Sequence, residues 1–217
     1  MHRCQIAQRA LDEKLLRYPD RYSAVFWLDA DMEASISQVR ELMDLVSLIA
    51  ECRPQPEDAK PLTDMDELKC WQRSMAPALS GAYVKRNDPL VMAARHVTPK
   101  VPPLKVSLDR GDSNLRKYEL PAIVAGMGCL MQTQEAFVAH CREAVTIENY
   151  GQDQFPAICA SGPGTGGDGN PAWASEDWTY TSWEWARGRG VYLVRHALFG
   201  HERTTVEYPT PETRIDD

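Results

Sequence analysis

Residues 24–31 read Ala-Val-Phe-Trp-Leu-Asp-Ala-Asp, and the interpretation of the whole chain starts from this stretch. Five consecutive apolar residues predict a short strand buried on both faces, because a strand with one wet face alternates apolar and polar residues. The carboxylates of Asp29 and Asp31 follow this strand directly. In open α/β sheets ligands bind at the carboxyl ends of strands, so the pair is a candidate site for a hard divalent cation. An acidic turn without a ligand is the alternative.

Helical patterns flank this strand on both sides. Apolar residues at helical spacing predict a helix over residues 5–17, and a second helix is predicted over residues 35–51. Ser35 and Gln38 form the pattern of a capping box at the start of the second helix. One side of that helix carries an apolar stripe typical of packing on a sheet, made of Ile36, Val39, Leu42, Val46 and Ile49.

The remaining sequence alternates between strand and helix patterns. Residues 80–86 and 191–195 predict strands, and residues 121–131 give apolar strand material interrupted by Gly126 and Gly128. Helices are expected to begin after Thr133 and after Ser175, which are suitable N-cap residues. Residues 87–118, rich in charge and proline, suggest extended edge strands and loops. This alternation predicts a three-layer α/β domain with a mixed sheet.

The predicted domain covers residues 1–208 as a single unit. Two segments, 53–77 and 161–172, are polar or rich in glycine and proline, and we expect them to be loop excursions. Within the first of them a short helix is expected around residues 65–71. Residues 209–217 are expected to form a loose tail.

The composition favours a soluble globular protein. The chain has 217 residues, of which 43% are hydrophobic and 25% charged. Its net charge of −7 argues against a broad surface for nucleic acid or anionic membrane. Six scattered cysteines show no zinc-site spacing, and Cys129 and Cys141 are expected in the core. With no signal peptide or membrane-spanning run, the expected location is cytoplasmic.

Four short motifs follow one another in a fixed order, at residues 29–31 (Asp-Ala-Asp), 126–128 (Gly-Met-Gly), 176–177 (Glu-Asp) and 200–201 (Gly-His). This order resembles the glycosyltransferases of the A-type fold, which use nucleotide sugars and are built on a Rossmann-like sheet. The surrounding text of residues 80–86 and 175–178 also resembles that family. The resemblance implies a Rossmann-like mixed sheet flanked by helices and a metal-dependent transfer of a sugar.

The resemblance also implies a metal centre. In this family an Asp-x-Asp motif and a carboxy-terminal histidine hold Mn²⁺ or Mg²⁺. Asp31 and His201 would ligate the metal directly, and Asp29 would either ligate it or face the ribose or a metal-bound water. A divalent metal would neutralise the charge that develops on the nucleoside diphosphate leaving group.

On the sugar side, the resemblance implies that Gly126 and Gly128 let the backbone approach the donor sugar. Asp177 is the candidate general base that removes the proton of the acceptor hydroxyl. Glu176 is expected to bind hydroxyl groups of the acceptor or the sugar.

Each of these residues also has a structural explanation. Glu176 and Asp177 could be favourable first-turn acids of a helix, His201 could be a hydrogen-bonded structural residue, and the two glycines could mark a bulge. The tryptophans could form a wall for stacking on sugars, although core packing explains at least two of them better. They are Trp173, Trp178, Trp183 and Trp185.

The chain departs from the family at its amino-terminal side. Family members usually place a strand, a helix and a second strand, which bind the nucleotide base, ahead of the Asp-x-Asp motif. Here only the helix of residues 5–17 precedes it, so the predicted domain is N-terminally shortened. The open sheet edge would invite a second copy or a partner chain.

The leading functional hypothesis is a metal-dependent glycosyltransferase that moves a sugar from a nucleotide-sugar donor to an acceptor hydroxyl. The acceptor could be a glycan, a small molecule, a protein or a modified DNA base. The alternative is a truncated, non-catalytic binding module or one half of a split enzyme. A metal phosphohydrolase is disfavoured because position 33 holds Glu, where that pattern has Thr or Val.

Overall fold

The fold is that of a computed structural model of the chain. It describes residues 2–15, 24–51, 78–85, 88–97, 101–109, 115–149, 153–159, 161–165, 171–187, 189–202 and 206–216. The segment 53–77, with the short helix expected around residues 65–71, lies outside the described residues.

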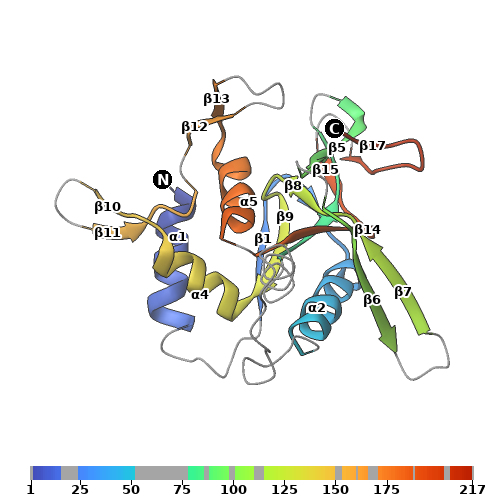
Figure 1. Cartoon of the computed structure of the whole chain (residues 1–217), viewed down its shortest axis with the longest axis horizontal. Coiled ribbons are helices and arrows are strands. Elements are labelled where there is room, and N and C mark those ends of the chain that lie inside the picture. The colour runs from blue at the N-terminus through green and yellow to red at the C-terminus, as the bar shows by residue number, and fades with distance from the viewer. Residues whose placement is uncertain are drawn as a thin grey trace, which may run out of the picture.

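A mixed four-stranded sheet forms the centre of the protein, as the sequence predicts (Figure 1). Its strands, in spatial order, are β1 (Ala24–Leu28), β9 (Cys129–Thr133), β3 (Ala78–Ala82) and β14 (Val191–Leu198). Strand β9 runs antiparallel to both β1 and β3, whereas β14 runs parallel to β3. Strands β1, β3 and β14 therefore point in the same direction, and their carboxyl ends meet at one edge of the sheet.

The apolar run of residues 24–28 is a strand, but its predicted complete burial is wrong. Within the described residues β1 pairs with β9 alone, and each of its side chains is partly exposed. Both faces still contact apolar clusters, since Val25 and Trp27 pack on one side and Phe26 on the other. The partial exposure follows from the position at the sheet edge.

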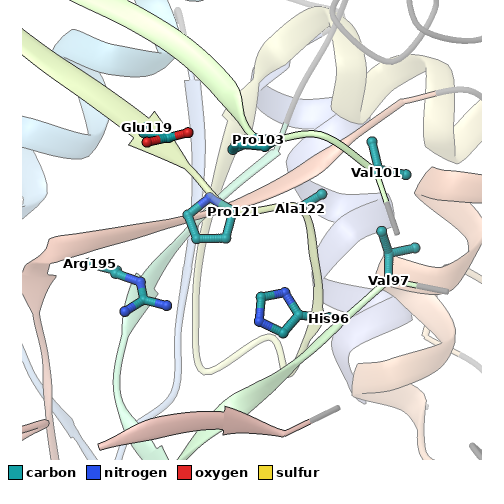
Figure 2. A pocket seen from close by; sticks show the side chains of 8 residues that line it. All are labelled: His96, Val97, Val101, Pro103, Glu119, Pro121, Ala122 and Arg195. Carbon is teal, nitrogen blue, oxygen red and sulfur yellow. The ribbon is translucent and has the colours of Figure 1, made fainter. Parts of the chain in front are cut away.

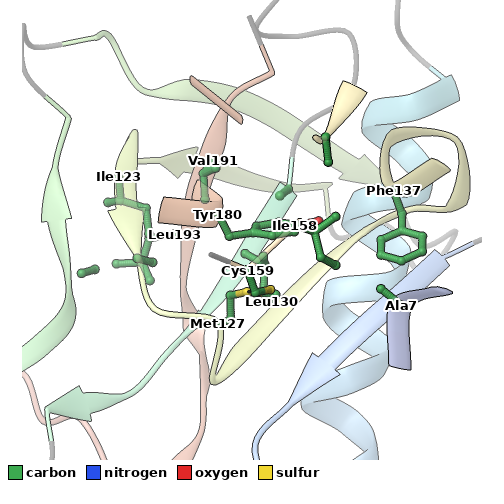
Figure 3. Close-up of a cluster of buried hydrophobic side chains, with 14 of the residues drawn as sticks. Ala7, Ile123, Met127, Leu130, Phe137, Ile158, Cys159, Tyr180, Val191 and Leu193 are labelled. Carbon is green, nitrogen blue, oxygen red and sulfur yellow. Dashed lines mark hydrogen bonds between the residues drawn. The ribbon is translucent and has the colours of Figure 1, made fainter. Parts of the chain in front are cut away.

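Helices cover the two faces of the central sheet and make three layers (Figure 1). Alternate strand residues face opposite layers. Leu79 and Met131 pack in the layer of helix α2 (Ile36–Glu51), and Leu130 and Leu193 pack in the other layer. Figure 3 shows the buried cluster that contains Leu130 and Leu193, in which Phe137 and Tyr180 pack with these strand residues. The helices are α1 (His2–Ala10), continued by a π-helical segment (Leu11–Leu15), α2 (Ile36–Glu51), α4 (Gln134–Glu143) and α5 (Glu176–Ala186).

The predicted helix starts at Ser35 and Thr133 are confirmed by their hydrogen bonds, whereas Ser175 precedes α5 as predicted but makes no side-chain capping hydrogen bond. The Ser35 amide donates to Gln38 Oε1 at 2.7 Å, and the Gln38 amide donates to Ser35 Oγ at 3.3 Å, which is a capping box. Thr133 Oγ1 accepts from the amide of Ala136 and caps α4. Of the predicted apolar stripe on α2, Ile36 is 80% exposed and does not belong to the core.

Smaller sheets and hairpins surround this centre. They contain β2 (Met32–Glu33), β4 (Val84–Lys85), β5 (Asp88–His96), β6 (Leu104–Asp109), β7 (Leu115–Leu120), β8 (Ile123–Ala125), β10 (Thr146–Asn149), β11 (Asp153–Pro156), β12 (Gly162–Thr165), β13 (Pro171–Ala174), β15 (Gly200–Glu202), β16 (Val206–Glu207) and β17 (Arg214–Asp216). Where a loop was expected over residues 161–172, β12 and β13 pair as antiparallel strands. Where a loose tail was expected over residues 209–217, β17 pairs in parallel with β5.

The cysteines and the lengths of the helices were also considered in the sequence predictions. Cys129 and Cys141 are buried and unpaired, as predicted for small core residues. Among the described residues, no helix combines the length and the apolar character needed to cross a membrane.

Gly81 in β3 offers a test of the packing between the sheet and α2's layer. A Cβ atom at this position would collide with the ring of Phe199 and approach Cys129 Sγ to 2.7 Å. Because both neighbours are fully buried, Gly81→Ala should lower the free energy of unfolding by about 1–3 kcal/mol, measured by chemical denaturation. Gly162→Ala is the matched control, since no atom lies within 4 Å of its added Cβ. Equal stabilities of the two variants would contradict this packing.

Candidate functional site

The strand directions bring distant parts of the sequence to one edge of the central sheet. Asp29 follows β1, Tyr83 follows β3, and His201 lies just beyond β14. Strand β9 runs the opposite way, so Gly128, which precedes it, lies at the same edge. The Asp29 amide donates to the carbonyl of Gly128 at 3.0 Å, which joins the first motif to the second.

A tight turn after β1 places Asp31 beside His201. The Met32 amide donates to the carbonyl of Asp29 at 3.1 Å and closes the turn. Strand β2 then pairs with β15, with Met32 opposite His201. As a result, His201 Nε2 lies 3.3 Å from Asp31 Oδ2, and His201 Nδ1 lies 2.9 Å from the carbonyl oxygen of Val84.

Helix α5 carries Asp177 in its first turn and is fixed to the sheet by buried polar groups. Tyr180 donates to Gln132 Oε1 at 2.8 Å, Thr181 Oγ1 donates to the carbonyl of Ala125 at 2.8 Å, and Trp185 Nε1 donates to a backbone carbonyl of β8. Tyr180 and Thr181 are fully buried. Because buried hydrogen bonds are costly to break, they hold the first turn of α5, and with it Asp177, against the sheet.

The four motifs meet at a cavity of about 380 Å³. Four of the predicted site residues line it, namely Asp29, Gly126, Asp177 and His201. The other described lining residues are Met32, Tyr83, Lys85, Ala93 and Trp178.

The other predicted residues, Asp31, Gly128 and Glu176, are not among the described residues that line this cavity. Asp31 contacts His201, which does line the cavity. Gly128 lies behind Tyr83 and donates its amide to Tyr83 Oη at 3.2 Å. Glu176 is exposed and accepts a hydrogen bond from Ser161 Oγ at 3.1 Å, and it is not among the described residues that line the cavity.

The two glycines are explained in part by packing. A Cβ at Gly126 would lie 2.5 Å from Tyr83 Oη, and a Cβ at Gly128 would lie 3.0 Å from the same atom. The position of Gly126 therefore needs glycine beside Tyr83, whereas a Cβ at Gly128 would require Tyr83 to shift slightly. Gly126 also lines the cavity, and a Cβ atom added to it would lie 3.9 Å from the Cβ of Asp177. Tyr83, which sequence patterns did not indicate, organises this part of the site.

Arg3 is a second residue of the site that the sequence patterns missed. Its guanidinium in α1 hydrogen bonds to both Asp177 and Asp29, the latter at 2.5 Å. Burial raises the pKa of the Asp177 carboxyl above its ordinary value, and the charge of Arg3 offsets part of this effect. Burial lowers the pKa of Arg3, but the charges of Asp177 and Asp29 outweigh it and raise that pKa. No local signal in the sequence links residue 3 to the other motifs.

The tryptophans divide between the core and the cavity. Trp178 lines the cavity, with the guanidinium carbon of Arg95 5.1 Å from the centre of its ring. Trp183 stacks with His140 and Arg187, and Trp185 packs against both core clusters, so these two are structural. Trp173, on β13, is 73% exposed.

The donor set for a metal is incomplete within the described residues. Among them, no group of three His, Cys, Asp or Glu side chains is placed to hold a metal ion. Asp31 and His201 bring two suitable donor atoms together, while the Asp29 carboxylate is engaged by Arg3.

A second cavity, of about 420 Å³, lies away from these motifs (Figure 2). Its wall combines apolar residues such as Val97, Val101 and Pro121 with polar ones, and Figure 2 shows the side chains of His96 and Arg195 pointing into the same space. Its described lining residues include no carboxylate pair and none of the residues of the four motifs. The first cavity is therefore the better candidate for catalysis.

Comparisons of the chain with family models, with curated proteins and with solved structures find no match.

Folding raises the pKa of Asp177 and lowers the pKa of Glu176, so the pH dependence of stability tests the environments of the two carboxylates. Since folding raises the pKa of Asp177, its ionised form destabilises the protein at neutral pH. Asp177→Asn should therefore increase the free energy of unfolding at pH 7, and the gain should vanish as the pH falls to the ordinary value of 3.8. The measurement is urea denaturation between pH 7 and pH 3.8.

Glu176→Gln is the matched control for this series. A hydrogen bond to its own backbone amide and one from Ser161 lower the pKa of Glu176, so its ionised form is stabilising. This variant should lose stability at pH 7, by less than about 1 kcal/mol because the side chain is exposed, and the loss should disappear in acid. The same sign for both variants would contradict the assigned environments.

Proposed function

We propose that the protein is a metal-dependent glycosyltransferase that uses a nucleotide-sugar donor and an acceptor hydroxyl. The observation that carries the proposal is the pairing of His201 with Asp31 at the edge where Asp29 and Asp177 also lie.

The hydrogen bonds of His201 specify which ring nitrogen faces the acid. A backbone carbonyl can only accept, so Nδ1 must carry the hydrogen that binds the oxygen of Val84. In a neutral imidazole Nε2 then has a lone pair, which faces the Asp31 carboxylate at 3.3 Å. Two acceptors at this distance repel each other unless a cation, either a proton on Nε2 or a metal ion, is shared between them.

The same geometry suits a metal ligand. Metal-binding histidines usually donate their other ring N–H to a carbonyl or carboxylate, as His201 does to Val84. Two neighbouring ligands of an octahedral cation with bonds of about 2.1 Å lie about 3.0 Å apart, close to the 3.3 Å between Nε2 and Oδ2. A carboxylate with one imidazole favours Mn²⁺ or Mg²⁺, which commonly complete their coordination with water and phosphate oxygens. Bound here, the metal would supply Lewis-acid stabilisation of the leaving diphosphate.

The other residues of the cavity fit the transfer step. Asp177 lies in the first turn of α5, and its side chain is 32% exposed. A carboxylate that is partly buried and held by a cation can accept the proton of an acceptor hydroxyl. Gly126 lines the same cavity as Asp177, where a donor sugar would lie, and Trp178 offers an apolar surface next to the same carboxylate.

A non-catalytic nucleotide-binding module is the second candidate. The observation in its favour is that Arg3 engages both Asp29 and Asp177. The edge position of β1 within the described residues also leaves a place where a second copy or partner chain could supply the base-binding half.

Calorimetric titration with UDP and GDP, each with and without Mn²⁺, tests the proposal. We expect one of the nucleotides to bind only in the presence of Mn²⁺, because a metal held by Asp31 and His201 would offset the negative charge of the diphosphate. Asp31→Ala should weaken this binding at least about tenfold, since it removes a charged ligand.

Glu119→Ala is the matched control, because Glu119 lines the second cavity, and we expect wild-type affinity. Binding that is independent of metal and unchanged in Asp31→Ala would contradict the metal site. Absence of binding to either nucleotide by the folded protein would contradict the use of these donors. Donor hydrolysis, followed on a sugar nucleotide that binds, then separates the enzyme from the binding module.

A further inference from the structure

The second cavity is built against a short segment, residues 121–122, that two strands hold in place. The Leu193 amide of β14 donates to the carbonyl of Pro121 at 3.0 Å. On the other side, the amide of Val97, which follows β5, donates to the carbonyl of Ala122 at 3.4 Å. Because both carbonyls are bound, residues 121–122 form a fixed wall of this cavity.

This wall brings two nitrogen-bearing side chains to one space. His96 ends β5, where it pairs with Ile123 directly after the wall. Arg195 lies on β14, two residues after Leu193, whose amide binds the wall. Figure 2 shows the imidazole of His96 and the guanidinium of Arg195 pointing into the same space. Strands far apart in the sequence thus supply two side chains that can donate hydrogen bonds into one cavity.

The guanidinium of Arg195 has no partner among the described residues, neither a carboxylate nor another acceptor. Glu119 lines the same cavity but forms no salt bridge with it. By contrast, Arg187 and Arg189 both bind the Glu143 carboxylate. Because a guanidinium has several N–H donors and no acceptor, Arg195 presents an unused set of donors to a ligand in the cavity.

The chemistry of these groups favours a carboxylate. The planar fork of an arginine matches the two oxygens of a carboxylate, and charge-assisted hydrogen bonds of this kind are strong. An imidazole donates a hydrogen bond from a ring nitrogen in both its neutral and its charged form. The negative charge of Glu119 at the same cavity opposes a doubly charged phosphate more than a singly charged carboxylate.

The rest of the cavity indicates an apolar body for the ligand. Its described lining includes Val97, Val101 and Pro121. Its volume of about 420 Å³ lies in the range of about 300–1,000 Å³ that is usual for small-molecule sites. We propose that the second cavity binds a small carboxylic acid with an apolar body, and that Arg195 and His96 hold its carboxylate. Neither the metal nor the nucleotide sugar of the proposed function enters this site.

The test uses three probes that share parts of this ligand. 2-Naphthoate carries a carboxylate and an apolar ring system, 2-naphthylmethanol keeps the rings without the charge, and acetate keeps the charge without the rings. Each is titrated into the ¹⁵N-labelled full chain, and the NMR chemical shifts of the backbone amides report affinity and location. We expect saturable binding of 2-naphthoate, with the largest shifts at Val97, Ala122 and Arg195. The alcohol and acetate should each bind at least about fivefold more weakly, because each lacks one of the two interactions.

Substitution of the two donors separates a built site from general adsorption to the surface. Arg195→Gln should weaken the binding of 2-naphthoate at least about fivefold, because a hydrogen bond to a charged group is lost. His96→Phe keeps a ring but removes the donor, and it should weaken binding at least about twofold. Glu119→Gln should tighten binding, because it removes a repelling charge. Arg40→Gln is the matched control, because Arg40 is exposed and belongs to the described lining of neither cavity.

Equal affinities for 2-naphthoate and the alcohol would overturn the proposal, because the guanidinium would then play no part. Shifts centred elsewhere, wild-type affinity in Arg195→Gln, an equal loss in Arg40→Gln, or no saturable binding would also overturn it. If Arg195→Gln does not fold, His96→Phe decides, and wild-type affinity there overturns the proposal. Titrations with UDP and GDP probe the first cavity, so failure of the proposed function and failure of this site remain distinguishable.

Discussion

The antiparallel insertion of β9 between β1 and β3 is the constraint on which the candidate site depends. Because β9 runs against both neighbours, its amino end lies at the edge where β1 and β3 finish. The glycine-bearing turn before β9 therefore meets Asp29 after β1 and Tyr83 after β3. With all strands parallel, the start of β9 would lie at the opposite edge of the sheet, far from the carboxylates.

Buried polar contacts fix the helix that carries the candidate base. On α5, Glu184 is fully buried and binds His140 on α4 and Arg189 beyond the helix end. The imidazole of His140 stacks on Tyr180 with ring centres 4.2 Å apart. Breaking a buried charged network leaves an unpaired charge in a medium of low dielectric, which is strongly unfavourable. The network therefore ties α4 and α5 together and keeps Asp177 at the cavity.

Much of the local structure follows from sequence patterns that act over a few residues. The capping box at Ser35, the N-cap at Thr133 and the apolar run of residues 24–28 each specify an element, because the interactions involved are local. Patterns of this kind contain no information on strand neighbours. That is why the edge position of β1, and the pairing of β17 with β5, did not follow from the sequence.

The sequence by itself determined the chemical groups of the candidate site and their order along the chain, because the motifs at Asp29, Gly126, Asp177 and His201 are visible as residue types beside predicted elements. Only the tertiary structure decided that these groups share one cavity and that Glu176 lies outside its described lining. It also added Arg3, which is 174 residues from its partner Asp177. Contacts between charges at such separations depend on how helices and strands pack, and no pattern of neighbouring residues encodes them.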